Sequence, residues 1–132
     1  MKKLIFFFFI AFIVNITVVN AQEKPIDGAS KNPPEGYIQP QYRDGLEAFY
    51  KYVEKGIKRR HMPSKSGKIY AYFIVEKDGS ISNVKILRGI EEKIDARIVK
   101  LISESIKWTP GYINGLPTRA SYNLPITITI GE

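Results

Sequence analysis

The second half of this chain carries an ordered set of turn signals that leaves few folds open to it. Residues 73–89 read as a strand, a tight Asp-Gly turn at Asp78-Gly79 and a returning strand. A helical stretch follows, and an Asn-Gly turn at Asn114-Gly115 then precedes a long alternating segment. Because two strands joined by a tight turn pair antiparallel, this half of the chain predicts a small α+β domain that ends on a strand.

The final segment, residues 120–130, alternates strictly between apolar and polar side chains. Such alternation is typical of an antiparallel strand that is buried on one face. Pro125 lies inside the segment, and proline has no amide to donate to a ladder, so we expect this strand at a sheet edge. Extended peptides dock at exposed sheet edges. The apolar set consists of Ala120, Tyr122, Leu124, Ile126, Ile128 and Ile130.

Two amphipathic helices are predicted around the strand at residues 69–75. Residues 44–58 form the first helix, with Asp44 as its cap and Glu47 three residues later. Residues 91–106 form the second. The apolar residues of both recur at helical spacing. They are Leu46, Phe49, Tyr50, Val53 and Ile57 in the first helix, and Ile94, Ile98, Leu101, Ile102 and Ile106 in the second. We therefore predict an α+β fold, with a three-stranded antiparallel sheet and two helices on one face.

The first 43 residues divide into two further predicted segments. Residues 1–21 have a charged start, an unbroken apolar run and a small-residue cleavage pattern, which is the layout of a secretory signal peptide. The alternative is a retained membrane anchor, for which the apolar run is short. Residues 22–43 are rich in proline and read as an extended linker. The domain itself is expected over residues 44–132.

Composition excludes several classes of function. The chain has no cysteine and a single histidine, His61, so no transition-metal site or other cofactor is indicated. His61 has no nucleophile or orienting group near it in the sequence, and we predict that the protein is not an enzyme. The formal net charge is +7, yet no nucleic-acid-binding motif is present. The basic cluster Lys55, Lys58, Arg59 and Arg60 is either a contact to an anionic envelope surface or a solvated helix end.

Several motifs, in this order, resemble the C-terminal domain of the TonB family. They cover roughly residues 45–130, and the extra helix at residues 45–58 resembles that of Bacteroidetes-type members. Each piece is weak alone, and the ordered combination is specific. The motifs are VEKDGSISNVKILRG at residues 75–89, Ile94-Asp95, KWTPG at residues 107–111, Asn114-Gly115 with Pro117 and Arg119, and YNLPI at residues 122–126.

The resemblance implies a role in energising outer-membrane transport. It implies that the domain grips an extended segment of a TonB-dependent receptor, or of another envelope protein, by adding it as a strand beside the last strand. Carried onto this sequence, the peptide-binding edge consists of Ala120, Ser121, Tyr122, Asn123, Leu124 and Ile126. The cleavable signal and the short linker depart from the family pattern. They argue against mechanical coupling, because a free domain cannot transmit force from a motor.

Three functional hypotheses follow. The first is an exported periplasmic binding module that recognises an extended protein segment. The second is a short transducer that keeps its N-terminal helix in the inner membrane and faces the periplasm. The third is a structural module that forms a homodimer through its own edge strands.

Overall fold

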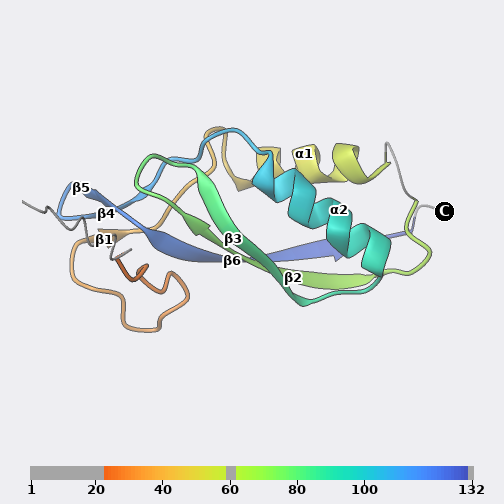
Figure 1. The fold of residues 1–132 in the computed structure, drawn as a ribbon, viewed down its shortest axis with the longest axis horizontal. Coiled ribbons are helices and arrows are strands. Elements are labelled where there is room, and N and C mark those ends of the chain that lie inside the picture. The colour runs from red at the N-terminus through yellow and green to blue at the C-terminus, as the bar shows by residue number, and fades with distance from the viewer. Residues whose placement is uncertain (1–22, 59–61, 131–132) are drawn as a thin grey trace, which may run out of the picture.

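The computed structural model describes residues 23–58 and 62–130 and shows an α+β domain (Figure 1). The predicted signal peptide lies outside the described residues, as do Arg59, Arg60 and His61 of the basic segment. Among the helices of the described ranges, none has the length and apolar character needed to cross a bilayer.

The main sheet has three antiparallel strands, as predicted. They are β2 (Gly67–Val75), β3 (Ile81–Arg88) and β6 (Ala120–Ile128), in the order β3-β2-β6. The Asp-Gly turn joins β2 to β3, and Gly79 has a φ of 84°, a left-handed conformation that glycine adopts without strain. β6 pairs with β2 without a register shift, from Gly67 opposite Ile128 to Val75 opposite Ala120.

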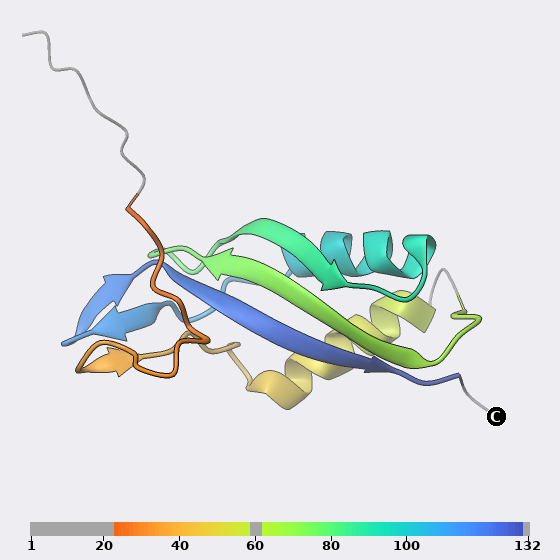
Figure 2. The ribbon, with the colours of Figure 1, turned by 90° about the horizontal axis from the view of Figure 1, so that it is seen from below.

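Both helices cover the same face of this sheet (Figures 1 and 2). They are α1 (Leu46–Lys58) and α2 (Glu92–Ser103). α1 begins two residues later than predicted, because Gly45 has a φ of 88° and its amide closes a turn on the Tyr42 carbonyl oxygen at 2.9 Å. The helices pack closely where Gly56 of α1 faces Leu101 of α2.

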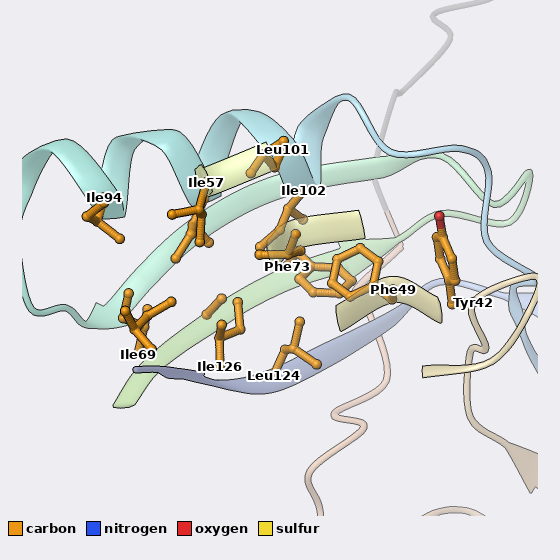
Figure 3. Packing of buried hydrophobic residues seen from close by; sticks show 14 of the residues in the cluster. Tyr42, Phe49, Ile57, Ile69, Phe73, Ile94, Leu101, Ile102, Leu124 and Ile126 are labelled. Carbon is orange, nitrogen blue, oxygen red and sulfur yellow. The ribbon is translucent and has the colours of Figure 1, made fainter. Parts of the chain in front are cut away.

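The core lies between this helical layer and the sheet (Figure 3). Trp108 is only 3% exposed, and its ring lies 5.1 Å from that of Phe49 and 5.2 Å from that of Phe73, centroid to centroid. Three of the ten predicted stripe residues are not buried. Tyr50 is half-buried, while Ile106, beyond the end of α2, and Leu46, at the start of α1, are exposed. The buried stripe residues are Phe49, Val53, Ile57, Ile94, Ile98, Leu101 and Ile102.

A second small sheet was not predicted. It consists of β1 (Tyr37–Ile38), β4 (Gly111–Ile113) and β5 (Leu116–Thr118), in the order β1-β4-β5. The predicted Asn-Gly turn joins β4 to β5, with positive φ at both of its residues.

Residues 23–43, which we expected to form an extended linker, are held against the domain. Tyr37 pairs with Ile113, Gln41 forms a bridge with Thr109, and Tyr42 is buried in the aromatic part of the core. The prolines set the local backbone, whereas these contacts to distant strands decide where the segment lies.

Candidate functional site

β6 is the outermost strand of the main sheet on one side, as Pro125 led us to expect. β2 occupies its inner flank along its whole length. The Ser121 amide donates a hydrogen bond to Ile26 on the opposite flank, at 2.8 Å. In an antiparallel pair the backbone groups of alternate residues point the same way. Ser121, Asn123, Pro125 and Thr127 therefore direct their backbone groups outward.

This register corrects the predicted set of edge residues. Ala120, Tyr122, Leu124 and Ile126 direct their backbone groups toward β2, so they cannot offer these groups to an added strand. Among the residues predicted for the site, Ser121 and Asn123 point outward. Sequence reasoning missed Thr127, although its place in the alternation, two residues after Pro125, could have indicated it.

The N-terminal segment already covers the start of the outer edge (Figure 2). Ile26 forms a parallel bridge with Ala120, and its amide donates to the Arg119 carbonyl oxygen at 3.0 Å. The Gly28 amide also donates to the Ser121 hydroxyl oxygen, at 3.1 Å. The Ser121 amide is thus occupied by the chain itself, and the outer edge is left to the part of β6 that follows it.

The Tyr50 side chain contacts the middle of the outer edge of β6. Its hydroxyl donates a hydrogen bond to the Pro125 carbonyl oxygen at 2.8 Å, and burial raises the pKa of this phenol. Within residues 23–58 and 62–130, no hydrogen-bond partner is found for the outward amides of Asn123 and Thr127. The two amides on either side of Pro125 are therefore the donors that an added strand can use.

A groove of about 530 Å³ continues this edge between β6 and α1. Its walls are largely apolar, and its lining also includes Lys68, Lys58 and Glu54. The apolar side chains that line it are Tyr50, Val53 and Ile57 of α1, Ile126 and Ile128 of β6, and Met62.

The opposite edge of the sheet is less suited to strand addition. β3 pairs with β2 through two register shifts, and Asn83 of β3 has a positive φ of 49°. Bulges of this kind twist an edge strand and interrupt its row of donors and acceptors. β6, whose pairing is regular, is therefore the better template.

A charged depression of about 460 Å³ lies at the other end of β6, and four of its charged residues form ion pairs. The Arg119 guanidinium donates to Glu76 from Nε at 2.6 Å and from Nη2 at 3.0 Å, and it also donates to the Glu23 carbonyl oxygen. The bond from Arg119 holds the pKa of Glu76 below its ordinary value of 4.5. Lys77 pairs with the Glu23 carboxylate at 2.7 Å. These contacts tie the N-terminal segment to the sheet.

Comparison with models of known protein families shows which family this chain belongs to. Residues 60–129, more than half of the chain, match the model of the Gram-negative bacterial TonB protein C-terminal family. The chain belongs to this family. Membership in a non-enzymatic family confirms the prediction that the protein is not an enzyme. In the described residues, no three His, Cys, Asp or Glu side chains gather as a metal site would require.

Two further comparisons complete this result. Among solved structures, the chain is similar to the solution NMR structure of the TonB C-terminal domain of Helicobacter pylori, with a TM-score of 0.38 and 14% identity. That match covers 68% of this chain and 88% of the other. Comparison with curated proteins gave no match.

Proposed function

We propose that this TonB-family domain works in the periplasm and binds an extended segment of an outer-membrane receptor, or of another envelope protein. The segment is added as a strand to the outer edge of β6 between Asn123 and the end of the strand at Ile128. Main-chain hydrogen bonds supply most of the affinity in this mode of recognition, and pockets beside the strand supply selectivity.

The observation that carries this proposal is the regular, outward-facing backbone of β6 after Ser121. The edge offers the Asn123 and Thr127 amides, while the competing edge at β3 is interrupted by bulges. Family membership adds support, because it links the fold to energised transport across the outer membrane.

A proline substitution in the edge tests the proposal. In Thr127→Pro, an outward donor is lost and the β2 ladder is kept, so the domain folds and its affinity for a peptide from the N-terminal periplasmic segment of a TonB-dependent receptor falls. Thr127→Val is the matched control, because it keeps the amide and should bind like the unaltered chain. Unchanged affinity in a folded Thr127→Pro domain would remove this edge from the site.

Nuclear magnetic resonance gives a second, residue-level test. On addition of the receptor peptide, we expect the largest amide shifts at Asn123 and Thr127, and little change along β3. Shifts concentrated on β3 or on the second sheet would contradict docking at β6.

The mode of membrane attachment is part of the proposal. We propose export with cleavage after Ala21, so that the domain is released and serves transport as an accessory. In the anchored alternative, the same domain works as a short transducer. The mass of the mature protein separates the two, since a chain that retains its first 21 residues would exclude the released form.

A further inference from the structure

The groove beside β6 is bounded by one element that lies before the matched family residues and one that lies within them. α1 ends at Lys58, and the match begins at residue 60. Val53 and Ile57 are buried residues of α1 that also line the groove. Ile126 and Ile128 of β6 form the facing wall. Any strand added at Thr127 would therefore run along an apolar wall that α1 contributes.

The geometry of an added strand assigns its side chains to two environments. Successive side chains of a strand point to opposite faces of the sheet. One set would enter the groove, between α1 and the apolar side chains of β6. The other set would lie on the opposite face, next to Thr127, with Lys68, the register partner of Thr127, one strand further away on β2.

The charge on this opposite face favours acidic residues in the second set. Glu54 is held by Lys58 at 2.6 Å, so its carboxylate is already balanced. Lys68 is exposed on the face of β2 that points away from the helices, and no acidic partner is found for it within residues 23–58 and 62–130. The chain carries a formal charge of +7, or +5 after removal of Lys2 and Lys3 with the first 21 residues, and either charge adds a favourable field for an anionic peptide.

We propose that the groove selects an extended peptide in which apolar residues alternate with acidic residues. This inference rests on the proposed strand addition at β6 and adds to it the chemical class of the bound segment. The apolar side chains fill the space beside α1, and the acidic side chains approach Lys68. Tyr50 limits the groove on the side of Pro125, where its hydroxyl occupies the carbonyl oxygen.

Two synthetic probes test the selectivity on the full chain. One is a fluorescent, end-blocked, eight-residue peptide that alternates valine with glutamate, and the other alternates valine with lysine. By fluorescence anisotropy, we expect the glutamate peptide to bind several-fold more tightly. Lys68→Glu should reverse this order, whereas Lys93→Glu, the same charge change at an exposed site on α2, should leave it unchanged.

A second pair of variants tests the apolar wall. Met62 is 71% exposed, so Met62→Asp should fold normally and weaken binding of the glutamate peptide several-fold, because it places a carboxylate in the groove. Leu87→Asp is the matched control on β3, where the leucine is 62% exposed, and it should bind as the unaltered chain does.

The outcomes separate this inference from the proposed function. Peptide binding that Thr127→Pro abolishes, but that neither Lys68→Glu nor Met62→Asp alters, would overturn the groove inference and leave strand addition in place. Binding of neither synthetic peptide would also overturn the groove inference. Binding of the receptor segment that does not respond to Thr127→Pro would overturn the proposed function itself.

Discussion

The Tyr50 hydroxyl on α1 donates to the Pro125 carbonyl oxygen on β6 across 75 positions of sequence. Pro125 is the one residue of β6 without an amide hydrogen, so it has no backbone donor to offer an added strand. Its carbonyl oxygen is already bonded to Tyr50 and could serve an added strand only by accepting a second hydrogen bond. This contact divides the outer edge into Asn123 on one side and the groove at Thr127 on the other.

Removing this hydroxyl should have a small effect on stability. In Tyr50→Phe the Pro125 carbonyl oxygen lies at an exposed site where water can replace the donor, so we expect a loss of about 1 kcal/mol or less in the free energy of unfolding. The matched variant is Tyr52→Phe, which removes a half-buried bond of 2.8 Å to the Leu101 carbonyl oxygen and should cost more. Denaturant unfolding measures both, and the reverse order would contradict this reading of the edge.

Gly56→Ala should destabilise the domain even though alanine favours helices. Helix propensity gains up to ~1 kcal/mol, but the added Cβ would overlap both δ-methyl groups of Leu101, and overpacking of this kind costs about 1–3 kcal/mol. A double-mutant cycle with Leu101→Ala measures the coupling. Purely additive losses would show that the two helices do not meet at this point.

The ion pair of Glu76 and Arg119 predicts an acid-sensitive contribution to stability. The pKa of Glu76 is lowered in the folded protein, so the contribution is fully present above pH 4.5 and is lost as the pH falls below 4.5 through the folded value. Glu76→Gln should therefore cost roughly 1–3 kcal/mol at neutral pH, and the difference from the unaltered chain should shrink in acid.

The control for this charge effect is Glu35→Gln, at an exposed position where the same change should cost little. Urea unfolding between pH 7 and pH 3 is the measurement. A cost of Glu76→Gln that stays constant over this range would show that the ion pair is not its cause.

Gly28→Val should release the N-terminal segment from the edge. A Cβ at Gly28 would overlap the Ser121 carbonyl oxygen, which is backbone and cannot move aside cheaply. We expect faster hydrogen exchange at the Ser121 amide, which now donates to Ile26. Ala29→Val, at the adjacent exposed position, should leave this exchange rate unchanged. Equal protection of Ser121 in both variants would mean that the segment tolerates the substitution.

The sequence by itself determined the turns and the buried faces of the helices and strands, because these depend on residues that are close together in the sequence. The Asp-Gly and Asn-Gly turns need positive φ at a few adjacent positions, and β6 and the two helices show their buried faces through periods of two and 3.6 residues. Pro125 indicated an edge strand for the same local reason, since its missing amide is tolerated where no ladder bond is required.

Only the tertiary structure decided which part of that edge is open. The Ser121 amide is occupied by Ile26, the Ser121 hydroxyl accepts from Gly28 93 positions away, and Tyr50 reaches Pro125 from α1. The pairing register also decided that Thr127, rather than Tyr122, turns its backbone outward. The contacts of Ser121 and Tyr50 do not follow from local periodicity, because each depends on how segments that are distant in sequence pack around one strand.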